Sequence, residues 1–298
     1  MRVVTYNVHG WVDAKMVPNA TRVVALLRKL DADVIALQEA TNGFGFDVAE
    51  EWYDSDEEAS DGYVPPSVRE VADALGMHAT TAPAGWGSNV LLTRSMPRNA
   101  DAVSIGSGPG GARSAALASV DTPFGRVTFV ATHLDPASES ARLMQLRNLA
   151  AVVGKRKAVI MGDFNALRFS DYTRDRLEWI AVERSESGIE EPSEAVVRHA
   201  DEMNWIDLVR LSAAGSARDY YRSFREALPI ELAVTSNFGT RVDYVWSTLR
   251  LAEHLKASGA RTIRSNASDH RAVEVTLEPD VALRGGRRVS SRRGSKKA

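Results

Sequence analysis

The chain has 298 residues, of which 44% are hydrophobic and 26% charged, a balance typical of a globular protein. It contains no cysteine, which excludes disulfides, thiolate metal sites and a thiol nucleophile. No apolar run approaches the ~20 residues that a membrane helix needs. The first strand-like segment begins at Val3, which leaves no room for a signal peptide, and we therefore expect a cytoplasmic protein without a transmembrane segment.

The net charge of −2 conceals a split along the chain. Seven of the 37 Lys and Arg residues lie between Arg284 and Lys297 with no acidic residue among them, which leaves 30 basic against 39 acidic groups elsewhere. We expect residues 1–278 to form one domain and residues 279–298 to be a disordered basic tail. Such a tail could hold the protein to nucleic acid or to an anionic lipid surface.

Short apolar runs alternate with helical patterns, which is typical of α/β proteins. We predict strands at residues 3–7, 34–39, 89–93, 117–120, 127–133, 159–163, 242–247 and 273–277, most of them rich in Val, Ile and Leu. Helices are predicted at 20–30 and 138–153, where apolar side chains recur at helical spacing, and at 67–75, which lies between Pro65-Pro66 and Gly76.

Three segments differ from this alternation of strands and helices. Residues 47–62 are rich in Asp and Glu, and we predict a solvated loop. Residues 168–204 are polar with a helical pattern, as in an insertion. The run 106–111 is rich in Gly but lacks the Lys-Ser/Thr of a P-loop, so we expect a flexible loop there.

Polar side chains with ligand chemistry stand at the ends of several apolar segments. They are Asn7, Glu39, His133, Asp163 with Asn165, and the pair Asp269-His270 directly before the last predicted strand. In an α/β sandwich such strand ends converge on one edge, so groups distant in sequence can meet there. We expect these residues to form one site.

The residue types in this set agree with one chemistry. A hard cation such as Mg²⁺ prefers oxygen ligands, and Glu39 and Asp269 supply carboxylates while Asn7 offers an amide oxygen. Bound Mg²⁺ neutralises charge that develops on a phosphoryl oxygen. His270 would carry a proton or hold a phosphate oxygen, with Asp243 as the carboxylate that fixes its tautomer and raises its pKa.

Six motifs, in this order, resemble those of the endonuclease/exonuclease/phosphatase superfamily. They are Thr5-Tyr6-Asn7-Val8, Ala36-Leu37-Gln38-Glu39, Ala131-Thr132-His133-Leu134, Met161-Gly162-Asp163-Phe164-Asn165, Arg241-Val242-Asp243-Tyr244 and Ser268-Asp269-His270. Together they span about residues 1–278, which the resemblance makes the catalytic domain. The resemblance implies a four-layer αββα sandwich of two packed mixed β-sheets with helices outside and an active site at one edge.

The resemblance also implies a role for each site residue. Glu39, with Asn7 and Asp269 close by, would bind Mg²⁺ or Mn²⁺. Asp163 would position or deprotonate the attacking water, and Asn165 would contact the phosphate. His270, oriented by Asp243, would contact the scissile phosphate, with His133 as a second phosphate or leaving-group contact. Whether Asp163 or His270 is the general base stays open.

Simpler structural interpretations exist for some of these residues. Asp163 and Asn165 could cap the turn after their strand. His133 could be a buried histidine with satisfied hydrogen bonds, and Asp243 could pair with Arg241.

The predicted reaction is Mg²⁺-dependent hydrolysis of phosphodiester bonds, with a nuclease acting on DNA or RNA as the first choice. The acidic body argues against tight duplex binding, whereas the basic tail argues for nucleic acid. The first alternative is a phospholipid or small-molecule phosphodiesterase or phosphatase of the same superfamily. The second is a non-catalytic module that binds nucleic acid or phospholipid. We expect a monomer.

Overall fold

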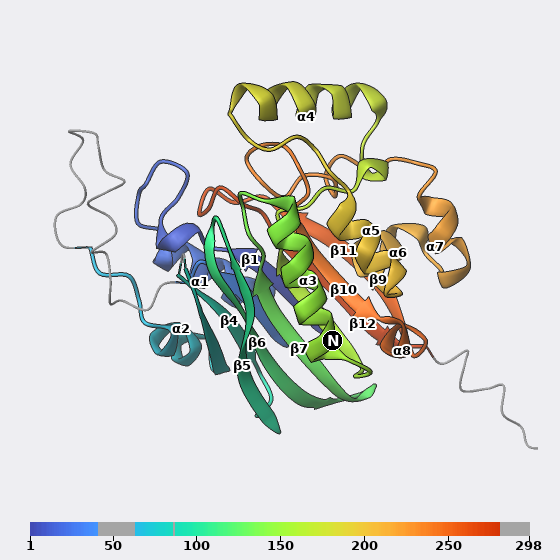
Figure 1. Ribbon diagram of the computed structural model, residues 1–298. Coiled ribbons are helices and arrows are strands. Elements are labelled where there is room, and N and C mark those ends of the chain that lie inside the picture. The colour runs from blue at the N-terminus through green and yellow to red at the C-terminus, as the bar shows by residue number, and fades with distance from the viewer. Residues whose placement is uncertain (41–62, 86, 281–298) are drawn as a thin grey trace, which may run out of the picture.

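The protein is described here by a computed structural model of residues 1–40, 63–85 and 87–280. The acidic loop predicted at 47–62 and the tail beyond residue 280 lie outside the described residues. Two β-sheets pack face to face, with helices on both outer faces (Figure 1). The predicted four-layer αββα sandwich is confirmed.

The first sheet brings the ends of three of its strands to one edge. Its strand order is β11-β12-β1-β2-β4-β3. β1 and β2 run parallel, so that Asn7 at the end of β1 lies beside Gln38 at the end of β2. β12 runs antiparallel to β1 and therefore begins at the same edge. The bounds are β1 Arg2–Asn7, β2 Val34–Gln38, β3 His78–Ala84, β4 Gly87–Thr93, β11 Leu255–Ile263 and β12 Ala272–Pro279.

The second sheet aligns three of the predicted site residues by register alone. Its order is β5-β6-β7-β8-β10-β9. His133 lies opposite Asp163 in the parallel pair β7 and β8, and Asp243 lies opposite Asp163 in the antiparallel pair β8 and β10. The bounds are β5 Asn99–Gly108, β6 Gly111–Thr122, β7 Gly125–His133, β8 Ala158–Asp163, β9 Trp205–Asp207 and β10 Asp243–Thr248.

Both faces of each sheet are buried, which explains why the inner strands are continuous apolar runs. Val3 of β1 packs in the core between the sheets, together with Phe129 and Met161. The next residue, Val4, points the other way and packs against the outer helices. Each inner strand therefore contributes to two hydrophobic clusters at once.

The outer layers are amphipathic helices with defined ends. α1 (Ala20–Leu30) and α2 (Val68–Leu75) cover the first sheet, and α3 (Glu139–Val153) and α5 (Ala195–Glu202) cover the second. Ser67 and Glu70 form a capping box at the start of α2, and Ser138 caps α3. None of the helices in the described part of the chain is long and apolar enough to cross a membrane.

The remaining short elements lie mostly between β8 and β11. They are η3 (Phe169–Asp171), α4 (Arg174–Glu186), α6 (Leu208–Ala214), α7 (Ala217–Ser223) and α8 (Leu249–Ala252), and η1 (His9–Trp11) follows β1. The predicted helical insertion at 168–204 thus contains η3, α4 and α5. Figure 1 shows α4 above the edge at which β1, β7 and β8 end.

The strands absent from the prediction are β3, β5, β9 and β11, and each of them is an edge strand of its sheet. β5 is exposed at most of its positions, and β11 is interrupted by a bulge between Ala257 and Gly259. The Gly-rich run at 106–111, predicted as a flexible loop, is the tight end of the β5–β6 hairpin, in which Gly108 pairs with Gly111. An edge strand packs on fewer neighbours, so its sequence need not be apolar.

A buried ion-pair network connects the insertion to the strand that carries Asp243. Arg241 lies 2.7 Å from Asp171 and 2.5 Å from Asp207, and Arg210 lies 2.7 Å from Asp171. All four side chains are almost completely buried. The pairing of Asp243 with Arg241, one of the simpler interpretations above, does not occur, because Arg241 is engaged by these two carboxylates and Asp243 by His270.

We expect Arg241→Ala to lower the free energy of unfolding by about 3–5 kcal/mol, because it removes the cation paired with buried Asp207 and one of the two cations paired with buried Asp171. Chemical denaturation measures this change. Arg174→Ala is the matched control, because Arg174 forms an exposed pair with Glu178 and should matter little. Equal unfolding midpoints for the two variants would contradict a structural role for the network.

Candidate active site

Most of the predicted site residues meet within hydrogen-bonding or near-contact distance at the edge shown uppermost in Figure 1. The Asn7 amide nitrogen lies 2.8 Å from Glu39 Oε1 and 3.2 Å from Asp163 Oδ2. Asp163 Oδ2 also lies 3.6 Å from His133 Nε2 and 3.7 Å from His270 Nε2. Asp163 is therefore the centre of the cluster, with residues from both sheets around it.

Two site residues adopt left-handed backbone conformations. Glu39 has φ 56° directly after β2, and Asn165 has φ 48° just after β8. Gly87 packs on the Glu39 backbone, where an added Cβ would lie 3.1–3.3 Å from Glu39 main-chain atoms. Such conformations persist where the surroundings impose them, and they are frequent at functional sites.

Gly162 is required by close contact with the neighbouring strand. It precedes Asp163 and has φ 155°, and a Cβ at this position would collide with the carbonyl oxygen of Thr132. Thr132 immediately precedes His133, so the contact lies beside two site residues. The glycine of the Gly-Asp-x-Asn motif thus lets β7 and β8 approach each other at the site.

The hydrogen bonds of Asn165 fix the protonation of His133. The Asn165 amide nitrogen donates to the Leu134 carbonyl at 3.1 Å and lies 3.0 Å from His133 Nε2. Because a carbonyl only accepts, this orientation makes Nε2 the acceptor and places the imidazole proton on Nδ1. Burial lowers the pKa of His133 to about 4, in agreement with a neutral ring.

His270 has the opposite electrostatic environment. Its Nδ1 lies 2.8 Å from Asp243 Oδ2, which orients the ring as predicted. Burial opposes protonation, but the charges of Asp243 and Asp163 and the hydrogen bond to Asp243 raise the pKa of His270 well above its usual value. Burial and the charge of Asp243 also raise the pKa of the Asp163 carboxyl, whereas the two histidines lower it. The surroundings therefore favour a neutral His133 and a cationic His270.

Asp269 lies at the rim and is joined to the cluster through its neighbours. Its Oδ1 is 3.9 Å from His9 Nδ1 and 3.3 Å from Ser268 Oγ. The Ser268 hydroxyl donates to the Asn7 carbonyl oxygen, and the backbone N–H of His270 donates to the same hydroxyl. Ser268 thus fixes the Asp269-His270 segment to the end of β1.

The donor set fits a hard divalent cation. Carboxylates outnumber the cationic groups at the cluster, and Asp243 Oδ1 is buried without a hydrogen-bond partner in the described residues. Ligand atoms of Asp163, Asp243 and His270 lie within 4.8 Å of one another and could hold a metal if His270 gave up its proton. The predicted set of Glu39, Asp269 and Asn7 is a second candidate; there the Asn7 amide oxygen accepts from the His9 backbone N–H.

Arg113 is a site residue that the sequence did not indicate. Its side chain is buried, its Nη2 donates to the Gly110 carbonyl at 2.9 Å, and two of its nitrogens lack a partner in the described residues. Burial lowers the pKa of its guanidinium, whereas Asp135, Glu39 and Asp163 raise it. The available signal was a lone arginine among small residues in β6, which the predicted strand at 117–120 was too short to include.

Asn89, in β4 of the first sheet, donates to the Ser114 carbonyl in β6 of the second at 2.8 Å. This hydrogen bond joins the two sheets below the site.

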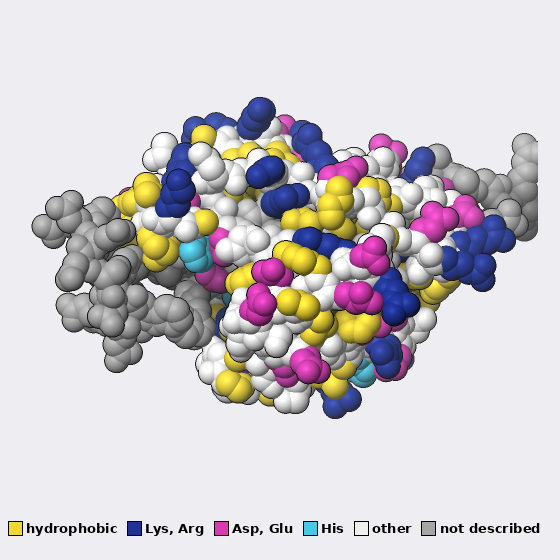
Figure 2. Space-filling view, turned by 90° about the horizontal axis from the view of Figure 1, so that it is seen from above, with side chains coloured by type: hydrophobic (Ala, Val, Ile, Leu, Met, Phe, Trp, Pro, Cys, Tyr) yellow, Lys and Arg dark blue, Asp and Glu magenta, His cyan; other side chains and the backbone are white. Residues whose placement is uncertain are grey.

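His270 lines two clefts, which also share Ser236. The larger, of about 740 Å³, is lined by the cationic residues Lys15, Arg176, Arg264 and Arg271 together with Asp13 and Asp269. The smaller, of about 250 Å³, contains Ile180, Ile189, Phe238 and Val242 and reaches Asn165. Figure 2 looks down on this edge of the sandwich and shows Lys and Arg side chains gathered over part of the face.

The sequence profile of the Endonuclease/Exonuclease/phosphatase family matches residues 4–270, and the chain belongs to this family. No curated protein matches it in sequence. The fold is shared by an endonuclease/exonuclease/phosphatase of Beutenbergia cavernae, with 18% identity over 94% of this chain and 71% of that one and a TM-score of 0.62.

Two further solved structures have the same fold. The human Nocturnin catalytic domain with bound sulfate is 16% identical over 94% of both chains, with a TM-score of 0.58. The mannosyl-6-phosphatase Bt3783 of Bacteroides thetaiotaomicron is 12% identical over 93% of this chain and 99% of that one, with a TM-score of 0.54. The family is one of hydrolases that act on phosphoric esters, and the predicted family membership is confirmed.

We expect Gly162→Ala to reduce phosphoester hydrolysis by about 100-fold, because the added methyl group would displace Asp163 or His133 by a fraction of an ångström or more. Turnover of bis(p-nitrophenyl) phosphate and thermal unfolding measure the effect. Gly125→Ala is the control: Gly125 also has positive φ (88°), but an added Cβ would meet nothing within 4 Å. The explanation fails if both variants lose the same activity and stability.

We expect Asp243→Asn to lower the pKa of His270, because burial lowers this pKa and the nearest carboxylate that raises it is removed. Wild-type His270 has a folded pKa above its unfolded value of about 6.5, so its stabilising effect is complete below that pH and is lost as pH rises through the folded pKa. The variant should lose stability mainly at the acidic side of this range. NMR titration of the histidines tests this, with exposed His254 as an internal reference that should not shift.

Proposed function

We propose that the protein is a Mg²⁺- or Mn²⁺-dependent phosphodiesterase whose catalytic groups are His270, Asp163, Asn165, Asp243 and His133. The observation that carries the proposal is the placement of Asp163 between a neutral and a cationic imidazole at the family's strand-end edge. A metal held by Glu39, Asp269 and Asn7 would neutralise charge on the phosphoryl oxygens.

The electrostatics favour Asp163 over His270 as the general base. A protonated His270 cannot accept a proton, whereas the raised pKa of Asp163 makes this carboxylate a better acceptor than an exposed one. Water would lose a proton to Asp163 as its oxygen bonds to phosphorus. The bond from phosphorus to the ester oxygen would break, with the departing oxygen stabilised by His270. Arg113 and His133 would contact the phosphate oxygens, and Asn165 would do so once its amide nitrogen releases the Leu134 carbonyl or His133 Nε2.

A nuclease is the first choice of substrate class because the larger cleft beside His270 is lined by four cationic residues. Although the whole chain is acidic on balance apart from its tail, charge at the cleft decides where a polyanion binds. The structural relatives leave the class open, because a 12–18% identical neighbour shares only the fold. A phospholipid or small-molecule phosphoesterase is the alternative.

The protein should nick supercoiled plasmid DNA or cut single-stranded oligonucleotides with Mg²⁺, and a chelator should abolish the reaction. We expect His270→Ala to reduce the rate by about 100-fold or more, as for loss of a proton-transferring or phosphate-binding group. His254→Ala is the matched control, since this exposed histidine lies outside the site.

A chain shortened to residue 280 shows whether the basic tail contributes, because weaker cleavage at low salt would indicate tethering. Cleavage by His270→Ala at the wild-type rate would overturn the proposed mechanism. Hydrolysis of phospholipids or small phosphodiesters without any cleavage of nucleic acid would select the alternative substrate class. Metal-independent binding without turnover of any phosphoester would select the non-catalytic module.

A further inference from the structure

The larger cleft contains two arginines whose charges are not balanced locally. Among its cationic residues, Arg176 donates to the Gly239 carbonyl at 2.9 Å and lies 3.9 Å from the centre of the Trp179 ring. Arg264 and Arg271, in contrast, make no ion pair or side-chain hydrogen bond with any of the described residues. Both belong to the connection from β11 to β12 and its junction with β12.

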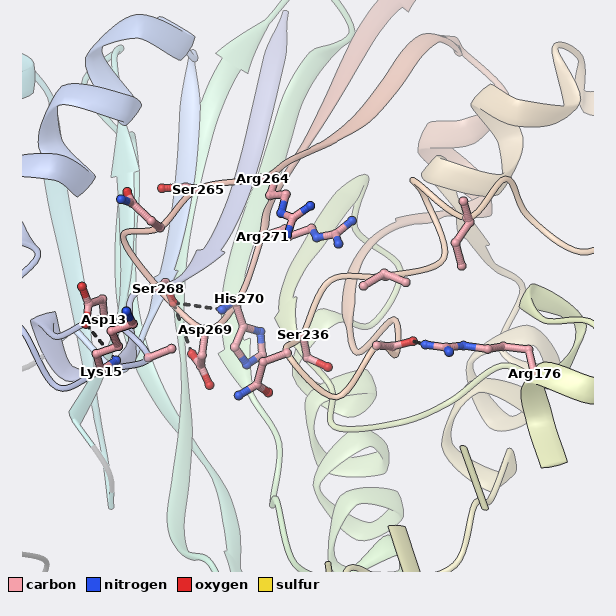
Figure 3. A pocket seen from close by; sticks show the side chains of 16 residues that line it. Asp13, Lys15, Arg176, Ser236, Arg264, Ser265, Ser268, Asp269, His270 and Arg271 are labelled. Atoms are coloured by element: carbon pink, nitrogen blue, oxygen red, sulfur yellow. Dashed lines mark hydrogen bonds between the residues drawn. The ribbon is translucent and has the colours of Figure 1, made fainter. Parts of the chain in front are cut away.

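The two guanidinium groups lie next to each other (Figure 3). Burial lowers the pKa of Arg271, and the charge of Arg264 lowers it further. The fully buried Arg142 has the carboxylate partners Glu139 and Glu190, whereas Arg264 is exposed, Arg271 is half-buried, and neither pairs with a carboxylate of the described residues. Two neighbouring cations without a carboxylate form a site that an anion would stabilise.

The position of this pair separates it from the reacting phosphate. Arg271 directly follows His270, and Figure 3 shows both guanidinium groups on one side of the His270 ring, away from Ser268 and Asp269. The two ring nitrogens face carboxylates: Asp243 Oδ2 lies 2.8 Å from Nδ1, and Asp163 Oδ2 lies 3.7 Å from Nε2. An anion between the arginines would therefore be near the scissile phosphate but distinct from it. Planar guanidinium groups bind phosphate oxygens through paired N–H donors.

We propose that Arg264 and Arg271 form a subsite for a second, non-reacting phosphate of the substrate. The preferred substrates would then carry a phosphate close to the bond that is cut. This inference rests on the proposed phosphodiesterase function and narrows its substrate class. The second phosphate has two chemical sources, the neighbouring linkage of a polynucleotide and a terminal phosphomonoester.

The kinetic test compares substrates that differ only in this group. They are a dinucleotide, the same dinucleotide with a 5′- or 3′-terminal phosphate, a trinucleotide, and a trinucleotide whose second linkage is a neutral methylphosphonate. For the wild type we expect kcat/KM to rise about tenfold when a second phosphate is present, equivalent to about 1.4 kcal/mol. Preference for the trinucleotide over its methylphosphonate form indicates the neighbouring linkage, and preference for the terminally phosphorylated dinucleotide alone indicates the monoester.

The variant Arg264→Ala/Arg271→Ala should abolish this preference. Arg147→Ala is the matched control, because Arg147 is an exposed arginine of α3 that does not line the cleft, and it should keep the preference. An equal preference in the double variant and the wild type would overturn the proposal. So would the absence of any preference in a wild type that cleaves all of these substrates.

A binding measurement separates failure of the subsite from failure of the proposed reaction. Calorimetric titration with inorganic phosphate needs no turnover, and the double variant should bind about tenfold more weakly or lose one site, whereas Arg147→Ala should not. Weaker binding by the double variant together with no cleavage of any nucleotide supports the subsite and rejects nucleic acid as the substrate. Unchanged phosphate binding rejects the subsite whatever the protein hydrolyses.

Discussion

The site depends on holding two buried carboxylates on either side of one imidazole. Asp163 and Asp243 are both almost fully buried, and His270 lies 3.7 Å from the first and 2.8 Å from the second. Burying one ionised carboxylate without compensation is costly, and burying two side by side costs more. The cationic imidazole offsets part of this cost, and the surplus of negative charge accounts for the fit of a divalent cation.

The fold maintains this unfavourable arrangement through strand register and packing. Asp163 faces His133 in one strand pair and Asp243 in the next, so none of the three can move without breaking ladder hydrogen bonds. Gly162 lets β7 and β8 approach at this point. Arg241, two residues before Asp243, is fixed by Asp171 and Asp207 and lies 4.2 Å from the Tyr244 ring centre. Energy gained from core packing thus keeps the charged groups close together.

The interior strands of both sheets could be predicted from the sequence, whereas the edge strands could not. All eight predicted strands are interior strands, because their two buried faces demand continuous apolar residues. The four edge strands escaped prediction since exposed positions carry residues such as the Asn-Ala-Asp-Ala start of β5. The polar site residues at strand ends could be predicted from the sequence because they interrupt apolar runs. Arg113 and Arg271 could not be predicted as site residues, because the side chains that surround them come from distant parts of the sequence and meet only in the folded protein.

The residues proposed for the reaction and the residues that line the substrate clefts lie in different parts of the fold. The groups proposed for chemistry stand at the ends of interior strands, where register fixes their positions and their motifs can be read from the sequence. Both clefts that include His270 are lined largely by loop residues; the larger contains four cationic residues, and the smaller contains more apolar ones. Loops that lie on the rigid edge can change without disturbing the ladder beneath them. Family membership therefore defines the class of bond that is attacked, whereas the substrate that presents this bond would be selected by cleft residues such as Arg264, which belong to no motif.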